Sequence, residues 1–280
     1  MLIFESQSLD VYRNLAIEEY LMDQKSESGP VLFLWRSECA VVIGKNQNPW
    51  RECRLDLMQQ ENIPLARRIS GGGTVYHDAG NLNYCVIVSR EKYCECDAYN
   101  MVFRALNALG VRAEKTGKSN LSVGGLKFSG NAFAFRSGRA MHHGTLLLDT
   151  DLMKLNRYLG GSMNHIETHA IASVPAEVTN LKLDLDKVVC ALKESFRFCY
   201  GGEEIIYQSE SNLDKEVLSG LESRKRTDEW LFGITPRFKV LVNGGELEVV
   251  KGVVVTADGD GVQRYLKKPF RDVAFSAFAD

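Results

Sequence analysis

A run of three glycines preceded by two arginines is the densest chemical signal in the sequence. The stretch reads RRISGGGTVYHD over residues 67–78. Three successive glycines let backbone N–H groups approach a ligand closely, because no Cβ stands in the way. Such N–H groups form a concavity that suits a phosphate or a carboxylate, and Arg67 and Arg68 add positive charge with forked donors. The stretch therefore predicts an anion-binding loop, with a tight strand–loop–strand turn and incidental arginines as the alternative.

A lysine in an extended segment is the second candidate. Residues 124–132 read GGLKFSGNA, and side chains along a strand alternate between its two faces. Leu126 and Phe128 would then share one face, and Lys127 and Ser129 the other. With the apolar face buried, Lys127 would point into a cavity, where an amine is costly unless it meets an anion. We hypothesise that Lys127 holds a carboxylate and the phosphate that attacks or leaves it. The alternative is an exposed strand lysine.

Two pairs of histidines are candidate metal ligands or site residues. His142 and His143 are adjacent in a predicted strand, so they point to opposite faces and do not easily bind one metal ion together. One of them is expected to reach the site while the other is packed or exposed. His165 and His169 have the i, i+4 spacing of metal ligands on a helix, but no obvious third ligand accompanies them. A surface loop is the favoured interpretation of that pair.

The elements that must hold these residues are predicted from periodicity, capping residues and turn residues. Gly124-Gly125 reads as the turn of a hairpin, and strands 31–35 and 40–43 as a pair around a short turn. Because strands and helices are interspersed without a regular βαβ repeat, the fold class is α+β, with a mixed or antiparallel sheet flanked by helices. The predicted helices cover 8–24 (with Ser8 as N-cap), 50–61, 97–109, 151–158 and 186–200, and the predicted strands cover 31–35, 40–43, 65–69, 82–88, 126–135, 139–148, 238–242, 247–250 and 253–256.

The composition changes towards the C-terminus. Residues 209–229 are polar and charged, which is typical of a solvated helix or a linker. The short strands after Trp230, split by Asn243-Gly244-Gly245, indicate a small β-rich appendage. We therefore predict a main domain that carries the candidate site over 1–205, a linker over 206–229 and a short accessory region over 230–280.

Bulk properties narrow the class of protein. Of the 280 residues, 45% are hydrophobic and 25% charged, so a sizeable core can form. The net charge of -2 argues against nucleic acid as the main partner, and no apolar run is long enough to span a bilayer. Seven cysteines without a framework spacing indicate free thiols in a reducing cytosol, and Cys94-x-Cys96 has no second pair to complete a zinc site. With no secretion signal evident, we expect a cytoplasmic protein.

These clusters, in this order, resemble the lipoate–protein ligase A family. The resemblance covers residues from about 30 to 200, and the segment 230–238 is similar to the entrance of the family's accessory domain. It implies a catalytic fold shared with biotin ligases (biotin/lipoyl protein ligase-like). Any one motif alone is weak, whereas the combination is specific. The matching stretches are RRISGGGTVYHDAGNLNY (67–84), GGLKFSGNA (124–132), HHGTLLLDTDL (142–152) and VTNL (178–181).

The resemblance also implies a two-step reaction. ATP and lipoate give lipoyl-adenylate and pyrophosphate, and a lysine of an acceptor then attacks the mixed anhydride. By position, Lys127 corresponds to the lysine that touches both ATP and lipoate, and it is the predicted catalytic residue. Val41, Ile43 or Tyr84 are the guesses for an apolar slot around the dithiolane. The residues expected to bind ATP or lipoyl-adenylate are Arg68, Gly71, Gly72, Gly73, Thr74, Val75, Tyr76, His77, Lys127 and His143.

The chemistry of that reaction agrees with the residue types. A carboxylate and a triphosphate must be aligned within attacking distance, so positive charge must offset their repulsion. Lys127 and Arg68 would stabilise charge on the α-phosphate, and Mg2+ would shield the outgoing pyrophosphate. The implied acceptors are lipoyl domains of 2-oxoacid dehydrogenase E2 subunits, the glycine-cleavage H protein, or both.

Two features depart from the family pattern. The family commonly shows Gly-Arg-Asn-Asp before the lysine strand, where this chain has Gly117-Lys118-Ser119-Asn120. An aspartate that can help to hold Mg2+ or the nucleotide is thereby replaced by uncharged Asn120. The region after Trp230 is also shorter than the full accessory domain. Adenylation could therefore need a separate accessory protein, or the chain could transfer a preformed lipoyl-adenylate.

Other interpretations stay open. An acyltransferase of the same superfamily would move octanoyl or lipoyl groups from a carrier protein without ATP, through a cysteine or a lysine–cysteine pair. Its candidates here are Cys85, Cys190 and Cys199, all among apolar residues, where a thiol is usually inert. A non-catalytic paralogue would bind lipoate or nucleotide without modifying an acceptor. A biotin ligase is disfavoured, because its Gly-Arg-Gly-Arg-Arg-Gly loop is not seen.

Overall fold

The structure is a computed structural model that describes residues 1–24, 29–163, 165–201, 206–208, 210–242 and 244–277. The chain forms two compact units, each made of segments that are distant in sequence. The first unit comprises Met1–Cys39, His77–Leu152 and Pro175–Glu222. The second comprises Ala40–Tyr76, Met153–Val174 and Ser223–Asp280.

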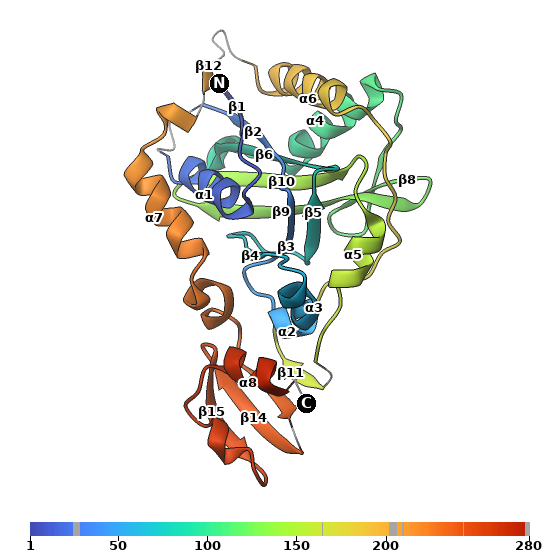
Figure 1. Cartoon of the computed structure of the whole chain (residues 1–280). Helices are drawn as coiled ribbons and strands as arrows, with labels where there is room; N and C mark the ends of the chain where they lie inside the picture. The colour runs from blue at the N-terminus through green and yellow to red at the C-terminus, as the bar shows by residue number, and fades with distance from the viewer. Residues whose placement is uncertain (25–28, 164, 202–205, 209, 243, 278–280) are drawn as a thin grey trace. The chain divides into compact units, whose positions relative to one another are not determined.

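An eight-stranded sheet is the framework of the first unit (Figure 1). The first three strands in its spatial order are parallel to one another, and the remaining pairs are antiparallel. The sheet is therefore mixed, which confirms the predicted α+β class. In spatial order the strands are β12 (Ile206–Gln208), β1 (Leu2–Glu5), β2 (Val31–Trp35), β6 (Asn81–Ser89), β10 (Arg139–Leu147), β9 (Leu126–Arg136), β8 (Asn120–Val123) and β7 (Glu114–Thr116).

The two faces of this sheet have different roles. Helices α4 (Glu95–Ala108) and α6 (Leu185–Tyr200) pack against each other (Figure 1) and bury their apolar sides in the main core. That core takes Tyr84 and Val86 from β6. The opposite face of β10 contacts α1 (Val11–Met22), which carries buried Glu18. The other elements that include residues of this unit are η1 (Arg90–Lys92), η2 (Glu210–Asn212), α5 (Leu152–Tyr158) and α7 (Lys215–Lys225).

The second unit combines two smaller sheets with short helices. Trp50 of α2 is fully buried, and its ring centroid lies 5.3 Å from those of Phe232 and Phe238 and 4.9 Å from that of Phe270. The C-terminal residues therefore share a core with α2. One sheet has the order β4 (Leu65–Arg67), β3 (Cys39–Ile43), β5 (Val75–Asp78), and the other β11 (Ile166–Thr168), β13 (Phe238–Val242), β14 (Gly245–Val250), β15 (Val253–Asp258); the helices are α2 (Pro49–Glu52), α3 (Leu55–Gln60), η3 (Glu229–Gly233), η4 (Gln263–Tyr265) and α8 (Phe270–Ala277).

Most predicted elements are present, and the errors have local causes. The first helix begins at Val11 because Asp10, not Ser8, is its N-cap: the Asp10 carboxylate accepts from the amide of Tyr12 at 2.8 Å. The single helix predicted over 50–61 is two helices, α2 and α3. The hairpin turn is confirmed, with φ of 56° at Gly124 and 81° at Gly125.

The pairing of strands 31–35 and 40–43 was predicted wrongly. Strand β2 pairs with β1 and β6 in the large sheet, whereas β3 pairs with β4 in the three-stranded sheet. Every residue of β2 is buried, and so is every residue of β3 except the first. Neither strand has the alternation of apolar and polar residues that would show which sheet it joins.

The predicted linker contains regular structure. Strand β12 pairs with β1 in parallel, and α7 occupies 215–225. Ser209 in this stretch, and Asn243 in the predicted turn near the C-terminus, lie outside the described residues. The domain boundaries at 205 and 230 stay predictions.

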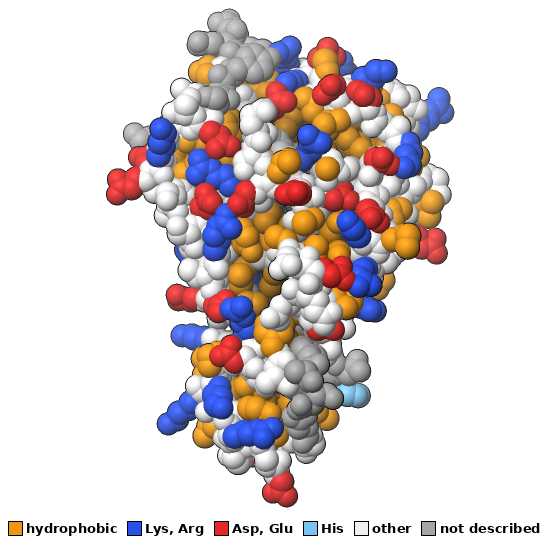
Figure 2. All heavy atoms as spheres, viewed as in Figure 1, with side chains coloured by type: hydrophobic (Ala, Val, Ile, Leu, Met, Phe, Trp, Pro, Cys, Tyr) orange, Lys and Arg blue, Asp and Glu red, His pale blue; other side chains and the backbone are white. Residues whose placement is uncertain are grey.

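The surface carries charges of both signs. On the face drawn in Figure 2, Lys and Arg side chains are interspersed with Asp and Glu, as expected from 34 basic and 36 acidic residues. Within the part of the chain that the structure describes, no helix is long and apolar enough to cross a membrane.

The aromatic core of the second unit can be tested by truncation. Replacing Trp50 with Ala removes a fully buried side chain and should lower the free energy of unfolding by about 3–5 kcal/mol. Urea titration followed by circular dichroism measures the change. Met153→Ala is the control, because that side chain is 85% exposed. A loss for Trp50→Ala as small as that of the control would contradict this assignment of the core.

Candidate active site

Arg68 shapes the glycine loop from within. The loop lies between β4 and β5, and Arg68 Nη2 donates to the carbonyls of Gly71 and Gly73, each at 2.6 Å. Arg68 Nε donates to Gly71 O at 3.1 Å, and Nη1 to Val42 O at 3.2 Å. The side chain is buried. Because Arg68 draws these carbonyls towards itself, we expect neighbouring amides to face away from it, in the direction that an anion-binding loop requires.

A glycine outside the loop, Gly44, allows the loop to lie close to the turn after β3. A Cβ at Gly44 would lie 2.4 Å from Gly72 O and 3.0 Å from Gly71 O, so no other residue fits there without moving the loop. Gly72 itself has φ of +85°, which favours glycine. The amide of Lys45 donates to Ser70 O at 2.8 Å. Sequence reasoning missed Gly44, because the contact is visible only once the two segments are adjacent.

A buried glutamine connects three segments of the second unit. Gln47 Oε1 accepts from the amide of Gly44 at 2.8 Å and from Thr74 Oγ1 at 3.0 Å. Gln47 Nε2 donates to Ser173 Oγ at 3.0 Å, and the amide of Thr74 donates to the same oxygen at 2.9 Å. Thr74, a predicted site residue, is thus held by Gln47 and Ser173. No motif in the sequence pointed to either of these two.

Two other residues of the predicted motif contribute mainly to packing. Arg67 is fully buried, and burial lowers its pKa to about 10. Its guanidinium donates to backbone carbonyls and to Thr235 Oγ1, so the expectation that it presents charge to an anion is not met. Tyr76 is also buried, with its ring 5.8 Å from that of Tyr158.

In the first unit, Lys127 lies beside a bulge in β9. Leu121 pairs with Ser129, but the next residue of β8 pairs with Lys127, so Phe128 is an extra residue on its strand. Leu126 is consequently 37% exposed while Phe128 is fully buried. The prediction that these two share one buried face is therefore wrong, because it assumed an uninterrupted alternation.

The VTNL motif fixes the backbone of Lys127. The amide of Lys127 donates to Glu177 O, and the amide of Thr179 donates to Lys127 O, both at 2.9 Å. Asn180 joins this segment to Thr150, which lies near the end of the stretch HHGTLLLDTDL (142–152). The Oδ1 of Asn180 accepts from the amide of Thr150, and its Nδ2 donates to Thr150 O. Two motifs separated in sequence from Lys127 thus help to hold it.

The amine of Lys127 lies on the face of the sheet that carries His143. A Cβ built on Gly130 would lie 3.4 Å from Lys127 Nζ, so the amine lies where a side chain at 130 would be. Ala132 is in register with His143, and Gly130 shares the face of Ala132 because they are two residues apart. This is the face opposite the main core, as the hypothesis about Lys127 required.

A chain of buried contacts links His143 to His77. His143 Nδ1 lies 2.9 Å from Glu18 Oε2, and Trp35 Nε1 donates to Glu18 Oε1 at 3.1 Å. The rings of Trp35 and His77 are 5.3 Å apart. Glu18 is 1% exposed. Sequence reasoning missed Glu18 and Trp35; the one available signal was the pair of acidic residues within the run LAIEEYLM of the first helix.

His142 faces the other way, into the core. Its ring stacks on Phe133 at 4.7 Å, and its Nε2 lies 2.9 Å from Asn131 Oδ1. Burial lowers the pKa of His142 to about 3. Tyr84 lies on this same core face and is hydrogen-bonded to Asn131, which does not support the guess that it lines a ligand slot. The opposite orientation of the two histidines is confirmed.

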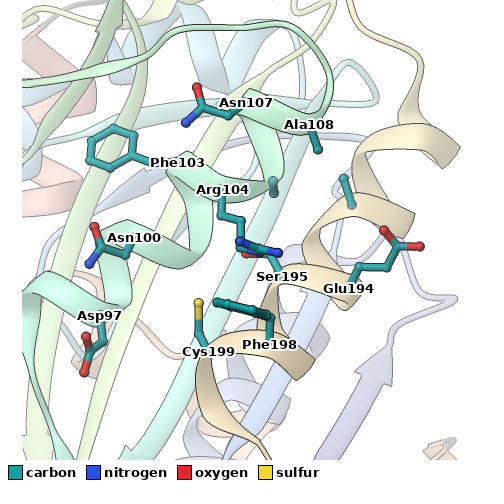
Figure 3. A pocket seen from close by; sticks show the side chains of 12 residues that line it. Asp97, Asn100, Phe103, Arg104, Asn107, Ala108, Glu194, Ser195, Phe198 and Cys199 are labelled. Atoms are coloured by element: carbon teal, nitrogen blue, oxygen red, sulfur yellow. The ribbon is translucent and has the colours of Figure 1, made fainter.

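Two of the three cysteines of the acyltransferase alternative have surroundings that disfavour the thiolate. Cys85 is fully buried, and burial raises its thiol pKa. Cys199 lines an open groove of about 880 Å3 between α4 and α6 (Figure 3), and burial raises its pKa as well. The Sγ of exposed Cys190 lies 3.8 Å from Glu194 Oε1. A raised pKa leaves little thiolate, so Cys85 and Cys199 are poor nucleophiles.

The other histidine pair is not arranged as the helical spacing assumed. His165 and His169 are exposed and flank strand β11, so they do not lie on one helix. Among the described residues, no three or more His, Cys, Asp or Glu side chains gather as a group that could hold a metal ion.

Comparison with known sequences decides the family. The Lipoyl protein ligase A/B catalytic domain matches residues 10–197. A lipoate-protein ligase A of Bdellovibrio bacteriovorus is 38% identical over an alignment of 248 residues, and the match covers 84% of this chain and 73% of that protein. The chain belongs to the lipoyl protein ligase A/B family.

Solved structures of lipoate–protein ligases have a similar fold. A lipoate-protein ligase A bound with ATP has a TM-score of 0.68 at 26% identity, covering 83% of this chain and 98% of that one. A bipartite lipoate protein ligase of Thermoplasma acidophilum, analysed together with its E2 lipoyl domain, has a TM-score of 0.67 at 26% identity, covering 83% of this chain and 96% of that one. The biotin/lipoyl ligase-like fold implied by the sequence motifs is thereby confirmed for this family member.

The environment of His142 gives a test that does not depend on activity. Because the folded-state pKa is about 3, the ring should stay neutral between pH 5 and 8, and its NMR signals should not move over that range. The unfolded state takes up a proton near its ordinary pKa of about 6.5, so this group makes stability fall as the pH falls from 6.5 towards 3. His142→Gln should remove that part of the pH dependence. A titration midpoint near the ordinary value would show that the ring is not buried as described.

Proposed function

We propose that the protein is an ATP-dependent lipoate–protein ligase in which Lys127 is the catalytic residue. The observation that carries this proposal is the position of the Lys127 amine in a member of this ligase family. The amine lies over Gly130, on the sheet face of His143 and away from the main core. A cation held there can accept an anion, whereas a lysine buried in the core could not.

The proposed reaction has two steps. A carboxylate oxygen of lipoate attacks the α-phosphorus of ATP, and the bond to the β-phosphate breaks as pyrophosphate leaves with the electron pair. The amine of the acceptor lysine then attacks the carbonyl carbon of lipoyl-adenylate, AMP leaves, and the amine loses a proton. The Lys127 ammonium would reduce the repulsion between the two anions in the first step and stabilise charge on the α-phosphate.

The glycine loop is proposed to bind the nucleotide through its backbone. Arg68 holds the carbonyls of Gly71 and Gly73, which supports a role for the amides of residues 71–73 in binding phosphate. Thr74, Val75 and Tyr76 extend the loop into β5. Thr74 and Val75 are proposed to contact the adenylate, and Tyr76, whose side chain is buried, is proposed to do so through its backbone. His77 and His143, connected through Trp35 and Glu18, are proposed to border the acyl group.

Mg2+ is proposed as part of the substrate, bound to the phosphates of ATP. Mg2+ commonly keeps several waters and binds through substrate phosphates rather than in an all-protein cage. Such a mode needs no dedicated carboxylate cluster among the described residues. The ion would supply charge neutralisation for the outgoing pyrophosphate.

The proposed acceptor is a lipoyl domain. The Thermoplasma ligase was analysed together with its E2 lipoyl domain, which supports the lipoyl domain of a 2-oxoacid dehydrogenase E2 subunit as the first acceptor to test and the glycine-cleavage H protein as the second. The free cysteines of the described chain favour a reducing compartment, and we propose the cytoplasm.

Transfer of a preformed lipoyl-adenylate is the second candidate, and the surroundings of Asn120 favour it. Asn120 is in register with Gly130, above which the Lys127 amine lies. The family's usual aspartate would place a carboxylate at this point, and the amide of Asn120 does not. A chain that lacks this charge could depend on a separate accessory protein for the adenylation step.

A mass-spectrometric assay separates these activities. Protein, Mg2+, ATP, lipoate and an apo lipoyl domain are mixed, and the lipoyl domain is weighed. A gain of one lipoyl group that disappears when ATP is omitted would identify the ligase. A gain seen only when lipoyl-adenylate replaces ATP and lipoate would identify the transferase, and ligand binding without any gain would identify a non-catalytic paralogue.

Substitution of the proposed catalytic lysine gives the sharpest residue-level test. Lys127→Ala should lower the rate of lipoyl-domain modification by two orders of magnitude or more (about 3 kcal/mol of transition-state stabilisation) while the circular dichroism spectrum is unchanged. Lys182→Ala is the matched control, because its ammonium forms an exposed ion pair with Asp149. Full activity of Lys127→Ala would show that the site assignment is wrong.

A further inference from the structure

Arg67 directs its guanidinium to backbone carbonyls and to a hydroxyl, and so makes an unusual set of contacts. Its side chain is fully buried in the second unit. Nη1 donates to three carbonyls in the turn after β3: Gly44 O at 3.2 Å, Lys45 O at 3.0 Å and Gln47 O at 2.8 Å. One guanidinium nitrogen therefore holds the shape of the turn 44–47.

The other nitrogens of Arg67 reach a segment far along the chain. Nε donates to Leu231 O at 3.0 Å, Nη2 donates to the same carbonyl, and Nη2 also donates to Thr235 Oγ1 at 3.0 Å. In return, Trp230 Nε1 donates to the carbonyl of Arg67 at 2.8 Å. Arg67 is thus attached through both its side chain and its backbone to residues 230–235.

The turn that Arg67 holds is the support of the glycine loop. Gly44 lies directly against the carbonyls of Gly71 and Gly72, the amide of Lys45 donates to Ser70 O, and Gln47 accepts from Thr74 Oγ1. A shift of the turn would therefore move the loop. Arg67 connects Thr235 directly to this turn.

Burial makes this connection stiff. A guanidinium removed from water is costly unless its donors are satisfied. The acceptors on both sides of Arg67 are consequently held to it, and loss of one acceptor changes the position of the others. A contact made by the C-terminal segment can in this way affect a loop to which the segment contributes no ligand-binding residue.

We propose that Arg67 is a positioning residue for nucleotide binding: it ties residues 230–235 to the turn 44–47, so that the affinity of the glycine loop for ATP depends on the hydroxyl of Thr235. The proposal rests on the proposed function only in that the loop binds ATP. It assigns to the C-terminal segment a part in shaping the nucleotide site.

The test compares two substitutions of Thr235, one that removes the hydroxyl group and one that keeps it. Thr235→Val keeps the shape but removes the acceptor hydroxyl, and Thr235→Ser keeps the hydroxyl. The dissociation constant of Mg-ATP is measured on the full chain by calorimetry without lipoate, and the melting temperature is recorded for each variant. Thr256→Val, on exposed β15, is the matched control.

Thr235→Val should weaken ATP binding by about three- to tenfold, the size expected for the loss of one hydrogen bond of ordinary strength. Thr235→Ser should bind ATP within twofold of the wild type, and so should the control. The proposal is overturned if Thr235→Val binds ATP as tightly as the wild type, or if its loss of affinity only follows the fraction unfolded at the assay temperature.

Failure of the proposed function can be told apart from failure of this inference. If the wild type binds ATP but modifies no lipoyl domain, the ligase assignment fails, while a weakened Thr235→Val still supports the role of Arg67. If the wild type does not bind ATP at all, both are overturned. If modification occurs and its KM for ATP is the same in Thr235→Val and wild type, the inference alone is overturned.

Discussion

A carboxylate and a triphosphate repel each other, and a protein that joins them must bring positive charge to both. We propose that Lys127 supplies this charge: its amine lies where a side chain at position 130 would be, and its backbone is held by bonds to residues 177 and 179. The bulge at Phe128 turns the apolar side chain into the core and leaves the amine on the opposite face. Around that amine, the sheet positions His143 by register and Glu18 by the packing of α1.

The two arginines of the glycine-loop motif use their charge differently. Both are buried, and the contacts described for them are to carbonyl and hydroxyl oxygens of the second unit. Their guanidinium groups therefore set the shape of the backbone, and we propose that the loop's own amides bind the anion. The charge of a residue in a motif does not by itself show that the residue touches the ligand.

The sequence contained enough information to find the family, the fold class and the positions of most elements. The glycine hairpin, the opposite orientation of His142 and His143, and the strand that carries Lys127 follow from turn chemistry and from alternation along a strand. These are local properties, and the structure agrees with them wherever the local geometry is regular.

The features that sequence reasoning missed depend on contacts between distant segments. Gln47 and Ser173 acquire their roles because both reach Thr74. The partners of β2 and β3 were predicted wrongly because strands that are buried throughout carry no alternating pattern. The shared face of Leu126 and Phe128 was predicted wrongly because one extra residue shifts the register, and a bulge has no clear signal in its sequence.

The packing of Trp50 against Phe232, Phe238 and Phe270 shows why the C-terminal residues should not be considered apart from the segment 40–76. They share one core, and Arg67 adds a polar connection close to the glycine loop. The supports of the loop are thus spread over segments that lie far apart in the sequence.

The central claim is that the Lys127 amine contacts the bound acid. NMR of protein labelled with 13C at lysine Cε measures this most directly, with the signal of Lys127 assigned from the spectrum of Lys127→Arg. We predict that saturating lipoate shifts the Lys127 Cε–Hε signal and that a non-hydrolysable ATP analogue shifts it further, while the signal of Lys182 stays in place. An unchanged Lys127 signal with both ligands bound would contradict the account.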